Sequence, residues 1–230
     1  MKKLNPYLLI LPLLVLLVIL LYISLSGSSC SKLTGNEKDN CLVHEAVVQE
    51  DITLCTTIVD TNFKEYCYTE LIKLSNNASA CSTLQDKRKG YCLTYFAEKQ
   101  NNSELCTGIT DTPWSDVCYG KMAKMQNNFE LCRAINYSSD RDICYNHLAL
   151  QLGQRQPCLR IDDNNKRVLC QADVAILLKD ILLCDMIVPN NVQGMCATTV
   201  ALSLDDANIC SHTRDGVIRR NCEHKFTKII

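Results

Sequence analysis

The pattern of apolar and polar positions repeats at a fixed interval along most of this chain. Cysteine occupies the most regular of the apolar positions. Successive cysteines are separated alternately by 11 or 12 and by 14 residues, so a unit of 25 or 26 residues occurs eight times. A fixed period in this range is typical of solenoids and other repeat arrays. The sixteen cysteines, two in each repeat, are Cys30, Cys41, Cys55, Cys67, Cys81, Cys92, Cys106, Cys118, Cys132, Cys144, Cys158, Cys170, Cys184, Cys196, Cys210 and Cys222.

Aligning the repeats on their two cysteines reveals further apolar columns. Three residues after the first cysteine stands Leu or Ile in every repeat except the last, which has Thr213. Five residues after the second cysteine stands alanine in six of the eight repeats, following a large apolar residue in pairs such as Phe96-Ala97 and Leu148-Ala149. These spacings predict one buried helical face around each second cysteine, and the small alanine permits close helix packing.

Residue types that cap helices mark the predicted helix starts. Four residues before the first cysteine lie Asp51, Asn77, Asn102, Asn128, Asp180 and Asp206. Six residues before the second cysteine lie Thr61, Asp86, Thr112, Ser138, Asn164, Asn190 and Gly216. All of these are favoured N-cap residues. Each repeat is therefore predicted to contain a short helix of about eight residues and a long helix of about fourteen.

The spacing of the cysteines from the predicted turns indicates how they pair. In an antiparallel hairpin, both cysteines of one repeat lie roughly 7–9 Å from the turn, at similar height. Pairing between successive repeats would leave a height mismatch of roughly 7 Å, whereas a disulfide needs Cα atoms about 4.4–6.8 Å apart. The predicted disulfides are Cys30–Cys41, Cys55–Cys67, Cys81–Cys92, Cys106–Cys118, Cys132–Cys144, Cys158–Cys170, Cys184–Cys196 and Cys210–Cys222.

The N-terminal segment predicts a membrane anchor. Lys2 and Lys3 precede residues 7–25, which carry no charge and would span roughly 28 Å as a helix, close to the thickness of a bilayer core. Basic residues before the span favour a short cytoplasmic tail at 1–6 and an extracytoplasmic domain at 26–230. Two alternatives remain open: a signal peptide cleaved after Ser24-Leu25-Ser26, and a lipoprotein signal ending at Cys30.

Composition agrees with an all-α fold in an oxidising compartment. Only 6% of residues are aromatic and eight are glycine, which disfavours β-sandwiches and barrels. The even number of cysteines, with no CxxC pair among them, favours disulfides over zinc sites. The predicted fold is an N-terminal transmembrane helix followed by an α-solenoid of about eight disulfide-linked helical hairpins. This arrangement resembles, in architecture only, the cysteine-rich Sel1-like and tetratricopeptide-like repeat proteins, and the resemblance implies no functional residue.

The sequence gives little sign of catalysis. Its formal charge is −1, which offers no basis for nucleic-acid binding. No nucleotide-binding, metalloprotease or hydrolase motif occurs, so we expect neither an enzyme nor a cofactor. The four histidines fall at scattered places in the repeat and predict surface positions rather than a metal site: His44, His147, His212 and His224.

A column of basic residues is the first candidate for ligand binding. Three residues before the second cysteine stand Lys38, Lys64, Lys89, Arg141, Arg167 and Arg219, which we call the basic ladder. A cation near the start of a helix is disfavoured by the helix dipole, so each side chain needs a partner. One interpretation is that it reaches the last carbonyls of the short helix or a nearby Asp. The other is that the ladder binds an anionic polymer or lipid headgroups.

Tyrosines and sequons complete the candidate sites. Tyrosines that flank second cysteines could form an aromatic binding strip or pack between repeats: Tyr66, Tyr68, Tyr91, Tyr119 and Tyr145. Asn77, Asn101 and Asn136 each begin an Asn-X-Ser sequence, although caps enrich Asn and Ser in any case.

These features together favour an interaction protein. We expect a single-pass protein of the cell membrane, with its N-terminus inside, whose repeat domain binds a protein or an anionic envelope polymer. A passive structural spacer and an accessory subunit of a membrane enzyme are the alternatives. An anchored spacer would need no defined binding surface, and this difference separates the hypotheses.

Overall fold

The computed structural model describes residues 29–227, and in this range every regular element is a helix. The predicted anchor at 7–25 and the tail at 1–6 lie outside the described residues. Within residues 29–227, no helix combines the length and apolar character needed to cross a bilayer. The elements are η1 (Ser29–Lys32), α2 (Gly35–Gln49), α3 (Ile52–Thr57), α4 (Thr61–Ser75), η2 (Ala78–Thr83), α5 (Asp86–Gln100), η3 (Ser103–Gly108), α6 (Thr112–Met125), η4 (Phe129–Ala134), α7 (Ser138–Leu152), η5 (Pro157–Arg160), α8 (Asn164–Leu178), α9 (Ile181–Asp185), α10 (Asn190–Leu204), η6 (Ala207–His212) and α11 (Gly216–Thr227).

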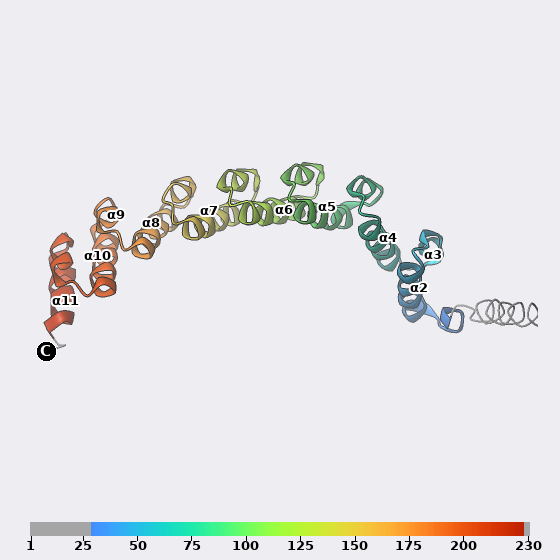
Figure 1. The fold of residues 1–230 in the computed structure, drawn as a ribbon, viewed down its shortest axis with the longest axis horizontal. Helices are drawn as coiled ribbons and strands as arrows, with labels where there is room; N and C mark the ends of the chain where they lie inside the picture. Colours follow the sequence, from blue (N-terminus) through green and yellow to red (C-terminus); the bar gives the residue numbers. More distant parts are fainter. Residues whose placement is uncertain (1–28, 228–230) are drawn as a thin grey trace, which may run out of the picture. The chain divides into compact units, whose positions relative to one another are not determined.

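The chain forms two compact units that divide between Cys92 and Leu93, within α5. Unit 1 contains the first three disulfides, and unit 2 contains the other five. Within unit 2, the short helices lie on one side of the layer formed by the long helices α6, α7, α8, α10 and α11 (Figure 1). The repeat predicted from the sequence is therefore confirmed as one short helix followed by one long helix.

The short helices are shorter and tighter than the predicted eight residues. They contain four to six residues, and six of the eight in the described chain are 3-10 helices. Their last hydrogen bond runs from the residue three positions after the first cysteine to the cysteine carbonyl, as in Ile109 N to Cys106 O at 3.1 Å. A helix of so few residues gains little from α-helical hydrogen bonds, and in six of the eight 3-10 geometry satisfies the backbone over one short turn.

The predicted N-caps of the short helices are confirmed, whereas those of the long helices are displaced by one residue. The side chains of Asp51, Asn77, Asn102, Asn128, Asp180 and Asp206 each accept the amide two residues ahead. The long helices begin at the residues predicted as caps, such as Thr61 and Asn164. The cap is the preceding residue, and Asp60 and Asp163 each accept two helix amides. A carboxylate also interacts favourably with the helix dipole, which explains the displacement at Asp60 and Asp163. At α7 and α10 the preceding residues are Tyr137 and Pro189, and neither makes a side-chain cap.

All eight predicted disulfides are present, and each joins the two helices of one repeat. Their Cα–Cα distances run from 5.5 Å for Cys30–Cys41 to 5.8 Å for Cys132–Cys144. These values lie within the range that a disulfide requires. No cysteine in the described chain is free. Equal height of the two sulfurs across the hairpin is thus what determines the pairing.

The predicted apolar columns form the core of each repeat. The aliphatic residue after each short helix is buried from Ile58 onward, and Thr213 replaces it, fully buried, in the last repeat. The alanine column is fully buried as well: Ala46, Ala97, Ala123, Ala149, Ala175 and Ala201. In unit 2, one core cluster runs through Ala123, Leu148 and Val174, which belong to three successive long helices. The hairpins therefore share a continuous core with their neighbours.

Two glycines of unit 2 test how tightly the long helices pack. A Cβ atom at Gly194 would lie 2.8 Å from Thr213 Cγ2 and 3.2 Å from Ile218 Cγ2. We expect Gly194→Ala to lower the free energy of unfolding by about 1–2 kcal/mol, because Thr213 is buried and cannot withdraw. At Gly120 the nearest atom would be 3.9 Å away. Gly120→Ala should therefore stabilise the helix by up to about 1 kcal/mol. Urea unfolding followed by circular dichroism measures both, and equal changes would contradict this difference in packing.

Candidate functional site

The long helices of unit 2 expose an apolar residue directly before each second cysteine. The cysteine points toward the short helix, and one residue back along an α-helix rotates the side chain by about 100°. Side chains at this position consequently point to a different side of the long helix than the cysteine does. We call these residues the apolar column: Val117 on α6, Ile143 on α7, Leu169 on α8 and Met195 on α10.

The apolar column is exposed and has a defined end. Its four side chains are between 44% and 62% exposed. In the last repeat the same position is held by Asn221, and in the first repeat it is held by Asn40. Scattered apolar residues are normal on a protein surface, but an aligned row of them indicates an interaction site.

Shallow cavities separate neighbouring long helices along this face. One of about 230 Å³ lies between α6 and α7, lined by Val117, Gly120 and Ile143. A second of the same volume lies between α7 and α8, where Ile143 and Leu169 form its walls. A third lies between α10 and α11 beside Met195. The first two share Ile143, which stands between them, so they form a row of two hollows across three helices, which we call the long-helix groove.

Charged side chains of both signs border the long-helix groove. Lys121 and Lys124 line its first cavity together with Asp140, whereas Lys166 and Asp173 line the second. Lys121 pairs with Glu98 at 2.5 Å. Desolvation raises the pKa of Asp173, which indicates the apolar character of the second cavity. The groove is thus an apolar strip with a mixed, nearly neutral border.

Buried polar side chains on the long helices fix the spacing of the repeats. The carboxylate of Asp142 on α7 accepts the amides of Asp162 and Asp163, which lead into α8, at 2.9 and 3.3 Å. Asp116 on α6 accepts the amides of Asn136 and Tyr137 in the same way. We call these interactions the carboxylate clamps. Each clamp binds the residues that lead into the next long helix. The clamps thereby fix the position of that helix and of its apolar-column residue.

Other repeats use related clamps. In unit 1, Asp39 accepts the amides of Val59 and Asp60. In the seventh repeat the buried side chain of Gln193 takes this role, because it accepts the amide of Arg214 and donates to the carbonyl of His212. Sequence reasoning missed the clamps, although a carboxylate stands two residues before the second cysteine in four repeats, at Asp39, Glu65, Asp116 and Asp142.

The arginines of the basic ladder bind their own repeats. Arg141, Arg167 and Arg219 donate to the carbonyls of Ile135, Ile161 and Thr213, which lie between the short and the long helix. These acceptors lie one residue past the end of each short helix, close to the last carbonyls and the nearby Asp that the first interpretation names. The bonds also offset the unfavourable position of a cation near a helix start.

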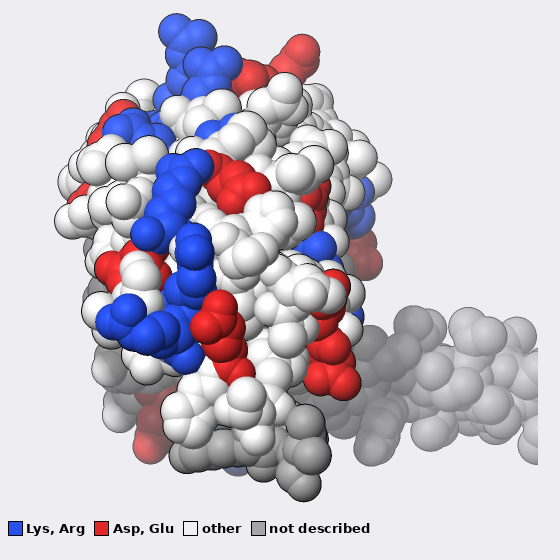
Figure 2. Space-filling view, turned by 90° about the vertical axis from the view of Figure 1, so that its left-hand side faces the viewer, with Lys and Arg blue, Asp and Glu red and all other residues white. Residues whose placement is uncertain are grey.

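Within residues 29–227, no comparable hydrogen bond to a carbonyl is found for the three lysines of the basic ladder. In unit 1, Lys64 and Lys89 are half-buried and Lys38 is exposed. The intervening positions Ser115 and Gln193 are buried. The guanidinium of Arg141 also pairs with Asp162. At the C-terminal end of the chain, Lys and Arg side chains lie next to Asp and Glu side chains rather than forming an uninterrupted basic surface (Figure 2).

The five tyrosines do not form one strip. Tyr145 is buried and Tyr119 packs against the same core cluster, while Tyr68 packs against the core of unit 1. Packing between repeats is therefore confirmed for these three. Tyr66 and Tyr91 are exposed and occupy the apolar-column position in unit 1. Arg88 lies over the ring of Tyr66, and Lys73 lies over that of Tyr91.

The histidines do not gather at one site. His44, His147 and His224 are exposed, and His212 forms a 2.9 Å contact with Asp185. Across residues 29–227, no three His, Cys, Asp or Glu side chains are grouped closely enough to hold a metal ion.

Comparison with known proteins adds no relative: no family model, curated protein or solved structure matches the chain. The likeness to Sel1-like and tetratricopeptide-like proteins therefore remains one of architecture. The site must be interpreted from its own geometry.

Proposed function

We propose that the chain is a membrane-anchored, extracytoplasmic scaffold whose long-helix groove binds an elongated segment of a partner protein. The observation that carries this proposal is the apolar column, exposed on four successive long helices of unit 2. A passive spacer gains nothing from an aligned apolar row, which promotes nonspecific association. An accessory subunit of a membrane enzyme would be one form of such a scaffold.

The length of the apolar column, which passes through the groove and continues to Met195 on α10, favours a linear partner. Packed helices lie about 8–10 Å apart, so four column residues extend over roughly 25–30 Å. An extended segment of about eight residues, or a helix of about eighteen, covers that length. Because the charges along the border largely balance, specificity would come from the pattern of apolar and charged residues in the partner.

The location of the scaffold rests on the sequence and on the disulfides. Disulfides persist in oxidising compartments, which supports export of the repeat region. The apolar segment 7–25 behind Lys2 and Lys3 supports anchoring with the N-terminus inside. An anionic polymer is a weaker candidate partner, since the ladder arginines of unit 2 are already engaged with carbonyls.

Photo-crosslinking in intact membranes tests the groove. A photoreactive residue at Ile143 of the full chain should capture a discrete partner in the cells that produce the protein. Ile143→Asp should weaken that association at least tenfold, because it places a charge in the centre of the apolar contact.

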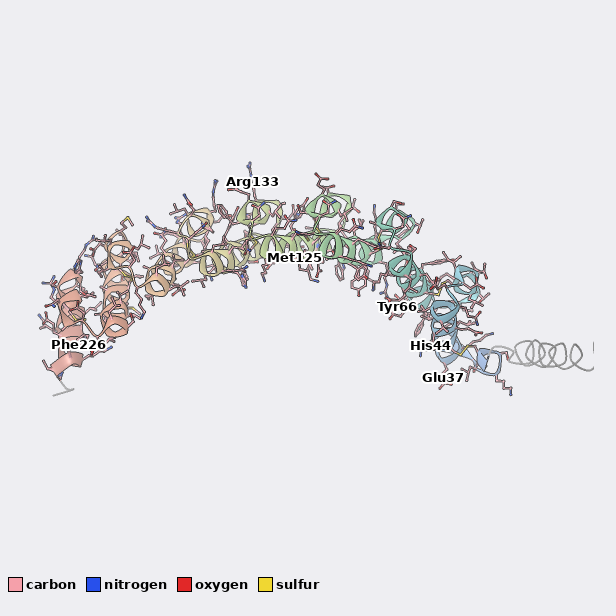
Figure 3. All side chains as sticks on the ribbon, in the orientation of Figure 1. Glu37, His44, Tyr66, Met125, Arg133 and Phe226 are labelled. Atoms are coloured by element: carbon pink, nitrogen blue, oxygen red, sulfur yellow. A yellow bond between two sulfur atoms is a disulfide. The ribbon has the colours of Figure 1, made fainter. Side chains whose placement is uncertain are left out.

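Leu159 supplies a matched control. It is 51% exposed, against 59% for Ile143, but it lies on η5 and thus on the short-helix side. Figure 3 labels one residue of each layer in unit 2, Arg133 on the short helix η4 and Met125 on the long helix α6. A photoreactive residue at position 159 should capture no discrete partner, and Leu159→Asp should not weaken the association. Equal capture from both positions, or none from Ile143, would rule out a binding site in the groove.

A further inference from the structure

Three Asn-X-Ser sequences occur in the described chain, and their side chains differ in whether they can take a sugar. An N-linked glycan is attached to the side-chain nitrogen of Asn in a sequence of this kind, on chains that are exported. The nitrogen must be free in the folded protein and must face solvent if the folded chain is to carry the glycan. The hydroxyl of the following Ser must also be accessible, since it is part of the recognised sequence.

The side chain of Asn77 is engaged as the N-cap of η2. Its side-chain oxygen accepts the amide of Ser79 at 3.1 Å and the Ser79 hydroxyl at 2.7 Å. The asparagine and the serine of this sequence are therefore bound to each other at the start of η2. Such closure withdraws the hydroxyl from recognition.

The side chain of Asn136 is hydrogen-bonded to the carboxylate clamp of Asp116. Its side-chain nitrogen donates to Asp116 Oδ1 at 3.0 Å, and its backbone amide donates to the same oxygen at 2.8 Å. Asp116 is only 5% exposed. This bond fixes the side-chain amide against the buried carboxylate, so a sugar on the nitrogen would have to fit beside the contact that joins α6 to the start of α7.

Asn101 meets the conditions that the other two fail. It is exposed at the end of α5, in the left-handed backbone conformation with φ 49°, and no hydrogen bond of its side chain is found in the structure. The side chain of Gln126 donates a hydrogen bond of 2.9 Å to the backbone carbonyl of Asn101. The backbone is therefore fixed, while the side-chain amide of Asn101 stays free. Ser103, the serine of this sequence, is half-buried. The side chain of Asn102 caps η3 by accepting a hydrogen bond from the Glu104 amide, and it does not bind Ser103.

We infer that Asn101 is an N-glycosylation site of the exported chain and that Asn77 and Asn136 are not. The side-chain nitrogen of Asn101 displaces a lipid-linked phosphate from the anomeric carbon of an oligosaccharide. The new carbon–nitrogen bond forms as the carbon–oxygen bond to phosphate breaks, the lipid phosphate leaves, and the amide loses one proton. This inference rests on the proposed extracytoplasmic location but does not depend on the partner-binding groove.

The position of the glycan is compatible with the groove. Asn101 lies ten residues beyond Tyr91, the column position of its own helix, which is roughly 15 Å along the axis. The sugar would therefore stand at the edge where α5 ends. The exposed apolar face remains open to a partner.

Expression of the full chain in cells with a glycosylating secretory pathway tests the site. The probe is digestion with a glycan-removing amidase, followed by gel mobility and peptide mass spectrometry. The wild-type chain should show the shift of one glycan, located on Asn101. Asn101→Gln and Ser103→Ala should each abolish the shift, whereas Ser79→Ala and Ser138→Ala should leave it unchanged.

A parallel chain with a secretory signal fused ahead of Met1 separates location from site. If only the fused chain carries a glycan on Asn101, the site is correct and the proposed location is wrong. A fused chain without a glycan, or with its glycan on Asn77 or Asn136, would overturn the inference about Asn101.

Discussion

Replacing Cys158 and Cys170 together with alanine should lower the free energy of unfolding by about 3 kcal/mol. Their disulfide closes a loop with a sequence separation of 12 residues, and such a constraint on the unfolded chain contributes about this much. Both sulfurs are buried, so the two alanines would also leave small cavities that add to the loss. Urea unfolding of the full chain in mild detergent, followed by far-UV circular dichroism, measures the change.

The terminal pair provides the control for this experiment. Cys210 and Cys222 belong to the last described repeat of unit 2, which has a neighbour on one side only. Removing this pair should unfold the last hairpin while leaving the remaining repeats near their original midpoint. If the internal double variant unfolds at the same urea concentration as the wild type, the disulfides are not what stabilises so short a hairpin.

Replacing Asp142 with alanine should destabilise unit 2 by about 2–4 kcal/mol. The substitution removes the acceptor of two amides, from Asp162 and Asp163, in a contact where the carboxylate is only 3% exposed. Hydrogen bonds to a charged acceptor contribute about 1.5–3 kcal/mol each, and these two lie in a partly buried contact. Hydrogen exchange should show the loss first at the start of α8, because those amides lead into that helix.

Asp173 serves as the matched carboxylate. It is exposed on α8, and desolvation raises its pKa, so its charge is not favoured by the fold. Asp173→Ala should therefore leave the free energy of unfolding unchanged or slightly increased at neutral pH. Equal destabilisation by the two variants would show that the clamp geometry contributes nothing beyond the loss of a carboxylate.

The features that recur in most or all repeats could be predicted from the sequence. Cysteine spacing, the alanine column and the caps of the short helices all repeat at fixed intervals, and residues such as Ala149 and Asn128 occupy the positions expected. Equal sulfur height across the hairpin then determined the pairing. Repetition makes each position visible several times, and single irregular residues therefore do not hide the pattern.

Features that depend on the packed hairpin could not be predicted. The long helices begin at Thr61 and Asn164 rather than one residue later, because Asp60 and Asp163 are stronger acceptors at the helix start. The apolar column was missed since its side chains vary from Val117 to Met195 and its exposure follows only from the direction of the short helix. The clamp at Asp142 joins residues twenty positions apart, which no local pattern reveals.

Peptide mapping of the non-reduced full chain tests the central claim, that each repeat is joined across its own turn. Digestion between the cysteines, followed by mass spectrometry, should return eight linked peptide pairs, each containing the first and second cysteine of one repeat. Peptides linking Cys118 to Cys132, or any other second cysteine to the first cysteine of the next repeat, would contradict the account, as would a substantial yield of free thiols.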